Sequence, residues 1–262
     1  MKHTLITGAS SGIGEVFARR LAAEKHNLVL VARSEGKLRD LSEELAKKHD
    51  VDVRYFAVDL TEHGSDAEVF DLTTRENLEI DWLINNAGFG SGGDFATLDI
   101  DKELKIVDLN IRALVGLTHR YLQGMRERKS GTIINVSSAA GFQPLPFMAT
   151  YAATKSFVTA FTEAIAEENR SFGVHVMALC PGSTKTNFFD ASGIDRPVQV
   201  KGQETAEDVV ETAMNAVSRG KTKVVSGWTN FIAASASNLV PNALITRVVG
   251  KALRSRYQAK SK

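Results

Sequence analysis

The sequence predicts an α/β protein built on a doubly wound parallel β-sheet. Three observations predict this class: short apolar runs alternate with amphipathic stretches of helical length, a glycine-rich turn follows the first run, and no linker or repeat interrupts the order. Such runs are typical of strands covered on both faces, and helical crossovers between them keep the strands parallel. We therefore expect a single domain over all 262 residues.

The composition is typical of a soluble globular protein, with 43% hydrophobic residues, 24% charged residues and a net charge of +1. A chain this close to neutral argues against a nucleic-acid-binding surface. The lone cysteine, Cys180, cannot form an internal disulfide, so we expect a reducing compartment, the cytoplasm. The first apolar run is too short for a signal peptide, and polar residues interrupt the apolar stretch 231–249, which argues against a membrane span.

The first strand is expected at residues 4–7, and a glycine-rich loop leads from it into an amphipathic helix. Gly8 permits a tight turn, Gly12 lets the backbone approach a pyrophosphate, and Gly14 allows close packing of helix and strand. This order aims free backbone N–H groups at a phosphate, although the spacing is Gly-x3-Gly-x-Gly and not the usual Gly-x-Gly-x-x-Gly. The dinucleotide contacts expected here are Gly8, Ser10, Ser11, Gly12, Ile13 and Gly14.

The second strand, residues 27–31, is followed by Ala32-Arg33-Ser34. The acidic residue that would hold the ribose 2′-hydroxyl of NAD(H) is absent there, and Arg33 stands beside that position. Because a guanidinium suits a 2′-phosphate, Arg33 indicates NADP(H), with NAD(H) as the less favoured cofactor. The alternative explanation is a solvated surface arginine.

The rest of the pattern continues the alternation. Helices are expected at residues 37–49, 67–74, 105–125, 151–170 and 205–218, and strands at residues 51–58, 80–84, 132–136, 174–179 and 222–226. Thr205 and Asp208 have the spacing of a capping box at the start of the last of these helices.

Tyr151 and Lys155 are one helical turn apart, so their side chains project from the same face. Neither group is a useful acid or base alone at neutral pH, but an ammonium beside a phenol favours the phenolate and lowers the phenol pKa. Ser138 follows the strand at residues 132–136, at the edge where open α/β sheets bind ligands. By itself the pair is also compatible with a packed tyrosine and a solvated lysine.

Taken together, the motifs resemble those of the classical short-chain dehydrogenase/reductase family. The matching residues keep the family's order and spacing over about residues 4–187, and they are Thr7 to Gly14, Asp59-Leu60, Asn85 to Gly88, Asn110, Ser138, Tyr151-x3-Lys155, Pro181-Gly182 and Thr186. Each motif is modest alone, and their joint occurrence is highly specific. The resemblance implies a Rossmann-type fold and reversible hydride transfer between a nicotinamide and a carbonyl or secondary alcohol.

The resemblance also implies a role for each matched residue. Tyr151 would give a proton to the carbonyl in reduction and accept it in oxidation, and Lys155 would bind the nicotinamide ribose and lower the Tyr151 pKa. Ser138 would hydrogen-bond the substrate oxygen, and Asn110 would hold a proton-relay water. Further cofactor contacts would come from Asp59 and Leu60 at the adenine, from Asn85, Ala87 and Gly88, and from Pro181, Gly182, Thr184 and Thr186, the last at the carboxamide.

Apolar side chains near these motifs favour an apolar substrate, although each could instead be ordinary core: Phe142, Phe147, Met148, Phe188 and Phe189. We expect a cofactor half at about residues 1–135, a catalytic and substrate half at about 136–230, and an amphipathic extension at about 231–262. No metal site is expected.

The C-terminal extension is basic. From Thr212 to Lys262 the sequence has nine Lys or Arg and no acidic residue, and apolar residues at helical spacing accompany the cations. We expect this segment to pack on the body or on a subunit partner, in a homo-oligomer that is a dimer or tetramer, with its cations in solvent. Peripheral contact with a membrane surface is the less favoured alternative.

Two other functions are compatible with related folds. A cofactor-sensing scaffold without turnover would not need Asn110, Ser138, Tyr151 and Lys155 together. A nucleotide-sugar epimerase would need a longer C-terminal substrate domain and a different glycine spacing, and the sequence has neither. The sequence thus favours an NADP(H)-dependent carbonyl reductase or alcohol dehydrogenase for an apolar small molecule, without naming the substrate.

Overall fold

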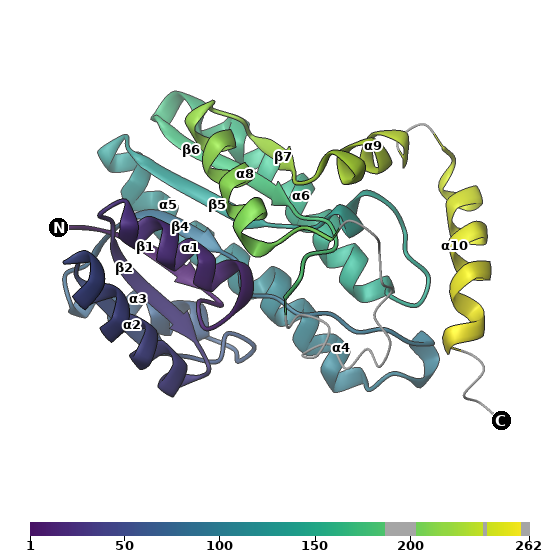
Figure 1. Cartoon of the computed structure of the whole chain (residues 1–262), viewed down its shortest axis with the longest axis horizontal. Coiled ribbons are helices and arrows are strands. Elements are labelled where there is room, and N and C mark those ends of the chain that lie inside the picture. Colours follow the sequence, from purple (N-terminus) through teal and green to yellow (C-terminus); the bar gives the residue numbers. More distant parts are fainter. Residues whose placement is uncertain (187–202, 238–239, 258–262) are drawn as a thin grey trace.

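The structure is a computed structural model that describes residues 1–186, 203–237 and 240–257 (Figure 1). These residues form a seven-stranded parallel sheet in the order β3-β2-β1-β4-β5-β6-β7. The strands are β1 (Lys2–Thr7), β2 (Asn27–Ala32), β3 (Val53–Ala57), β4 (Glu79–Asn85), β5 (Gly131–Val136), β6 (Val174–Cys180) and β7 (Lys223–Val225). The predicted doubly wound parallel sheet is confirmed.

Helices connect the strands and cover both faces of the sheet (Figure 1). In chain order they are α1 (Gly12–Ala23), α2 (Glu35–His49), α3 (Ser65–Arg75), α4 (Ile100–Val107), α5 (Leu114–Arg128), α6 (Ala149–Asn169), α8 (Ala206–Ser218), α9 (Trp228–Ser237) and α10 (Asn242–Tyr257). The predicted capping box is present, because Thr205 Oγ1 accepts from the Asp208 N–H while Asp208 accepts from the Thr205 N–H.

The core has two halves, one on each face of the sheet. Alternate strand residues supply them: Ile6 packs in the half that contains α1, α2 and α8, whereas Leu5 packs in the half that contains α3, α5 and α6. Both residues are fully buried. Because every interior strand is covered on both sides, its residues are apolar in continuous runs and not in alternation.

The strand order reverses between β1 and β4. From β1 the chain proceeds outward to β2 and β3, then crosses back so that β4 pairs with the other edge of β1. The loops after β1 and β4 therefore diverge, and open α/β sheets bind ligands in the crevice that such a switch point creates.

One predicted helix differs in an informative way. The expected helix at residues 105–125 is α4 and α5 joined by a π-helical segment, Asp108–Ala113, which contains Asn110. π-Helical turns are rare and often occur at functional sites. The chain after β7 forms α9 and α10, which lie at one end of the molecule (Figure 1). Within the described part of the chain, no helix is both long enough and apolar enough to cross a membrane.

Candidate active site

A cleft of about 790 Å³ runs along the carboxyl ends of the strands. The loops after β1, β2, β3, β4, β5 and β6 all contribute to its lining. The cleft thus lies where the strand order predicts a ligand site.

The loop after β1 forms part of the cleft wall, where the sequence predicts phosphate binding. Gly8 and Gly12 have φ of +66° and +59°, a left-handed backbone that glycine adopts without strain. A side chain on Gly14 would strike the Gly8 carbonyl, so Gly14 serves packing and lies outside the cleft lining. Ser10, Ser11 and Ile13 line the cleft, and the Ser11 side chain does not cap α1. The N-terminus of α1 is therefore available to an anionic group.

The loop after β2 adds positive charge. Arg33 lines the cleft with its side chain 70% exposed, and its Nη1 lies 3.8 Å from Asp59 Oδ2. Ser34 and Lys37 line the cleft beside Arg33, and neither was predicted from the sequence. Arg33 and Lys37 provide two cations at the point where a 2′-phosphate is expected.

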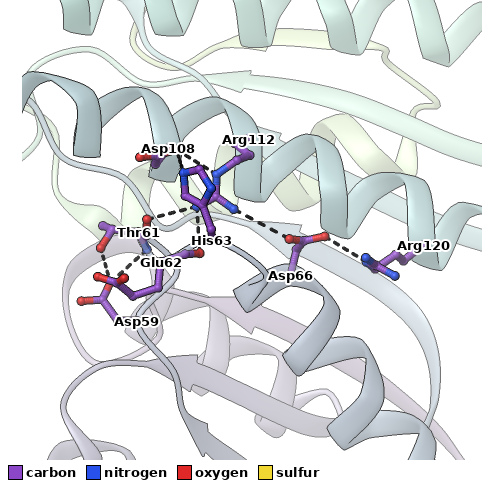
Figure 2. A network of polar contacts seen from close by, with 8 residues as sticks. All are labelled: Asp59, Thr61, Glu62, His63, Asp66, Asp108, Arg112 and Arg120. Carbon is purple, nitrogen blue, oxygen red and sulfur yellow. Dashed lines mark hydrogen bonds and ion pairs between the residues drawn. The ribbon is translucent and has the colours of Figure 1, made fainter.

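Asp59 is held by its own loop, in which Thr61 donates both its backbone N–H and its hydroxyl to Asp59 Oδ1, at 2.9 and 2.8 Å. Leu60 lines the cleft beside Asp59. Arg112 joins this loop to the π-helical segment, since its guanidinium donates to the carbonyls of Thr61 and Glu62 and to Asp108 (Figure 2). The loop of Asp59 and Leu60 is thus tied to the segment that carries Asn110.

Of the residues after β4, Ala87 and Gly88 line the cleft but Asn85 does not. The buried Asn85 side chain points away and donates to Thr118 and Asn135, at 3.0 and 2.9 Å. Asn86, which was not among the predicted contacts, lines the cleft instead and donates to the carbonyl of Thr7. In this structure the Asn85 side chain braces the sheet and Asn86 borders the cleft, and a cofactor contact by Asn85 remains a prediction.

The predicted catalytic pair lies at the centre of the cleft. Tyr151 and Lys155 are both buried on α6, with Lys155 Nζ 5.9 Å from the centroid of the Tyr151 ring. Lys155 Nζ donates to the Val136 carbonyl at the end of β5, at 2.8 Å. The neighbouring Ser137 hydroxyl donates to the Lys155 carbonyl at 2.7 Å, which fixes α6 against β5.

Burial sets the protonation of this pair. It raises the pKa of Tyr151 to about 12, against the opposing effect of a hydrogen bond with the Ser138 side chain, and lowers the pKa of Lys155 to about 8. Lys155 is not among the groups that shift the Tyr151 pKa in this structure, so the lowering of the phenol pKa by Lys155 remains a prediction. At neutral pH the phenol is therefore protonated, the form that can donate a proton to a carbonyl.

Ser138 begins the short helical turn after β5. Its hydroxyl oxygen accepts from the Ala140 N–H at 3.1 Å, and it lines the cleft next to Tyr151. Ser138 thus lies at the carboxyl edge of the sheet, within hydrogen-bonding reach of Tyr151, and its contact with the substrate oxygen remains a prediction.

Asn110 lies behind the pair and not in the cleft lining. Its Oδ1 accepts from the Phe89 N–H at 3.2 Å, and its Nδ2 donates to the Phe89 carbonyl at 3.0 Å. The same Nδ2 donates to the Thr154 hydroxyl at 3.0 Å. A side chain on Gly88 would come within 3.0 Å of Asn110 Oδ1 and 3.3 Å of Lys155 Nζ. In this arrangement Asn110 positions the turn after β4 against Lys155, and the water-holding role remains a prediction.

The loop after β6 closes the cleft on its other side. Pro181, Gly182, Thr184 and Thr186 all line it, as predicted. Asn230 of α9, which was not predicted, also lines the cleft; its side chain packs directly on Gly182 and donates to the Glu204 carboxylate.

The end of the cleft nearest Tyr151 is lined largely by apolar side chains. The predicted Phe142 and Met148 are among them, together with residues that sequence reasoning missed: Phe89, Leu109, Leu145, Ala234 and Tyr257. Phe147 instead stacks on the Tyr257 ring at 5.2 Å and so attaches α10 to the loop before α6. Phe188 and Phe189 lie outside the described residues.

A dinucleotide with a 2′-phosphate fits the residues present. The glycine cradle gives close backbone approach, the uncapped start of α1 accepts an anion, and Arg33 and Lys37 supply the charge that the extra phosphate requires.

Comparison with known proteins agrees with this geometry. The family model for short chain dehydrogenases matches residues 2–197. The very-long-chain 3-oxoacyl-CoA reductase of Rattus norvegicus is 31% identical over 98% of this chain and 82% of its own length. The NADP-dependent 3-hydroxy acid dehydrogenase of Schizosaccharomyces pombe is 31% identical over 86% of this chain and 90% of its own.

Solved structures give the same result. A short-chain dehydrogenase from Sphingobium yanoikuyae in complex with NADPH has a TM-score of 0.80 and 32% identity, covering 86% of this chain and 87% of that one. An alcohol dehydrogenase from Comamonas testosteroni that is specific for bulky-bulky ketones has a TM-score of 0.76 and 31% identity over 86% of both chains. The chain therefore belongs to the short-chain dehydrogenase/reductase family, whose members are oxidoreductases of CH–OH and C=O groups, and it uses NADP(H).

Proposed function

We propose that the protein reduces the carbonyl group of an apolar substrate at the expense of NADPH, with Tyr151 as the proton donor. The observation that carries this proposal is the protonated, buried Tyr151 hydroxyl, hydrogen-bonded to Ser138, at the point where the polar and apolar parts of the cleft meet.

The chemistry divides between cofactor and protein. When bound, the reduced nicotinamide supplies the hydride that adds to the carbonyl carbon. Tyr151 donates its proton to the carbonyl oxygen as negative charge develops there, and Ser138 donates a hydrogen bond to the same oxygen. Lys155, held by the Val136 carbonyl, stabilises the phenolate that Tyr151 becomes. The product is the corresponding alcohol, and the reverse sequence oxidises it.

The substrate class follows from the apolar end of the cleft. Phe89, Leu109, Phe142, Leu145 and Met148 offer no charge to a ligand, so a ketone with long or bulky hydrocarbon groups suits them. The printed names of similar proteins include a very-long-chain 3-oxoacyl-CoA reductase and a dehydrogenase for bulky ketones. We propose a long-chain 3-oxoacyl thioester as the first candidate.

We also propose that the protein is a cytoplasmic homo-oligomer. Exposed apolar side chains on α4 and α6 support assembly, among them Ile100, Leu104 and Phe157. Sedimentation velocity over a range of protein concentrations measures the oligomeric state, and a single monomeric species would contradict the proposal.

A substrate panel tests the proposed reaction. NADPH oxidation should be measured with 3-oxoacyl thioesters of increasing chain length, bulky aromatic ketones and steroid ketones. We expect kcat/KM to increase with chain length, because each methylene buried in the cleft contributes about 0.8 kcal/mol. No turnover of any of these carbonyls, together with intact NADPH binding, would favour the cofactor-sensing alternative.

A further inference from the structure

Helix α9 exposes an uncharged apolar face. Trp228, Phe231 and Ile232 have the spacing of one helix face and are 75%, 56% and 46% exposed. The sequence of α9 contains no charged residue. Single exposed apolar side chains are ordinary on protein surfaces, but three on one helix face form a patch typical of an interaction surface.

Helix α10 exposes a face that is apolar on one side and cationic on the other. Leu244 and Val248 are one turn apart and 55% and 61% exposed. Arg247, Lys251 and Arg254 are exposed as well. Each of the five residues lies three or four positions from another member of the set, so all five side chains share one broad face of the helix.

Other residues of α10 contact the body of the protein. Gly250 is buried near Pro146, and the Tyr257 ring stacks on Phe147. The contacts between α10 and the body are therefore made by residues other than the exposed ones.

The same two helices form part of the wall of the active-site cleft. Asn230 and Ala234 of α9 and Tyr257 of α10 line it, and both helices lie at one end of the molecule (Figure 1). Each helix thus contributes residues to the cleft wall and exposes other side chains to solvent.

The charge of the exposed face limits its partner. The sequence has no Asp or Glu after Glu211, so neither helix carries a carboxylate that could offset the cations. A second copy of the chain, docked through the same face, would bring cations against cations. A surface that is both apolar and anionic complements the face, and a bilayer with acidic headgroups has both properties.

We propose that the exposed faces of α9 and α10, together named the lipid face, bind the surface of an anionic phospholipid bilayer. It consists of Trp228, Phe231, Ile232, Leu244, Val248, Arg247, Lys251 and Arg254. The apolar side chains insert between the headgroups, and the cations contact acidic lipids. An apolar substrate that leaves the bilayer at the lipid face is then close to the active-site cleft. The binding itself does not depend on the proposed reaction.

Vesicle sedimentation tests the lipid face. Vesicles of phosphatidylcholine with and without phosphatidylglycerol are mixed with the whole protein at low and high salt, and the bound fraction gives a partition coefficient. One variant reverses two lipid-face charges, Arg247→Glu with Lys251→Glu. A matched control reverses two exposed charges on α2, Lys47→Glu with Lys48→Glu, and a third variant, Leu244→Ser with Val248→Ser, removes apolar contact.

We expect salt-sensitive binding to the acidic vesicles only. The lipid-face charge reversal should lower the partition coefficient by at least about 30-fold, and the α2 control by less than about threefold. The Leu244 and Val248 variant should also bind weakly. NADPH binding by all variants should equal that of the unmodified protein, since none of these residues lines the cleft.

Three results would overturn the proposal. One is failure to bind either kind of vesicle at low salt. Another is an equal loss of binding in the lipid-face and α2 charge variants, which would indicate attraction to net charge alone. The third is unchanged vesicle binding by the Leu244 and Val248 variant together with conversion of an oligomer to a smaller species, which would assign the face to a second copy.

Discussion

Arg33 should decide the preference for NADPH, and Arg33→Ala is the variant that isolates its contribution. The guanidinium has one neighbour of opposite charge, Asp59 at 3.8 Å, and is 70% exposed. A hydrogen bond to a charged group contributes about 1.5–3 kcal/mol, and solvent exposure favours the low end of that range. A loss of about 1.5 kcal/mol is roughly a tenfold weaker NADPH affinity.

Two further features refine this value. Lys37 also lines the cleft at this position, so Arg33→Ala should leave measurable selectivity, and the combined loss of both cations should remove it. Asp59 would lose its neighbouring cation and would repel the 2′-phosphate. We therefore expect the effect of the single substitution to be confined to NADPH, with NADH affinity changed by less than about twofold.

Fluorescence titration with NADPH and NADH measures both affinities. Arg39→Ala is the matched control, because Arg39 is an exposed arginine on α2 that lies outside the cleft lining. Equal losses for the two coenzymes in Arg33→Ala, or tighter binding of NADH than NADPH by the unmodified protein, would refute the role given to the end of β2.

Three further outcomes follow from the geometry. The rate of carbonyl reduction should fall as pH rises through about 8, where Lys155 loses its charge, while Tyr151 stays protonated up to about 12; a pH–rate profile flat to pH 10 would contradict this. Arg112→Ala should lower the free energy of unfolding by about 1–3 kcal/mol, and should weaken NADPH binding more than Arg120→Ala, which removes contacts with Asp66 and the Phe70 ring and none with the loop of Asp59; denaturant titrations and binding measurements check this. Gly88→Ala should reduce kcat because a methyl group would press on Lys155 Nζ, whereas Gly36→Ala, with no atom within 4 Å, should leave both kcat and folding intact.

The predicted site residues that the structure brings together in the cleft are those identified from local spacing. The strand, glycine loop and helix at Gly8, the pairing of Tyr151 with Lys155 one turn apart, and Ser138 after a buried strand all depend on neighbours in the chain. Such local patterns keep their meaning in the folded state, because strand and helix periods fix which side chains share a face.

Other parts of the site depend on contacts between distant segments. Asn230 and Tyr257 reach the cleft only because α9 and α10 return to it, and no local pattern around either residue indicates that return. The π-helical turn at Asn110 has no signature in the hydrophobic pattern. The Tyr151 pKa depends on burial, which a pairwise argument from one neighbouring charge does not include.

Strand geometry explains why the Asn85 side chain lies away from the cleft. Asn85 is two residues beyond Leu83, so alternation places both side chains on the same face of β4, toward the core half that contains α3 and α5. Asn86 falls outside that half and borders the cleft. Applying the strand period to the end of β4 would have indicated that Asn86, and not Asn85, lines the cleft.

The most direct test of the proposed mechanism is single-turnover reduction of a good ketone substrate by Tyr151→Phe with NADPH prebound. The substitution removes one hydroxyl from a buried ring and leaves Ser138 and Lys155 in place, so NADPH affinity should stay within about threefold of the original. The rate of NADPH oxidation should fall by roughly 100-fold or more, the contribution typical of a positioned general acid. A variant that binds NADPH normally and reduces the ketone at a rate near that of the unmodified protein would contradict the assignment of Tyr151 as the proton donor.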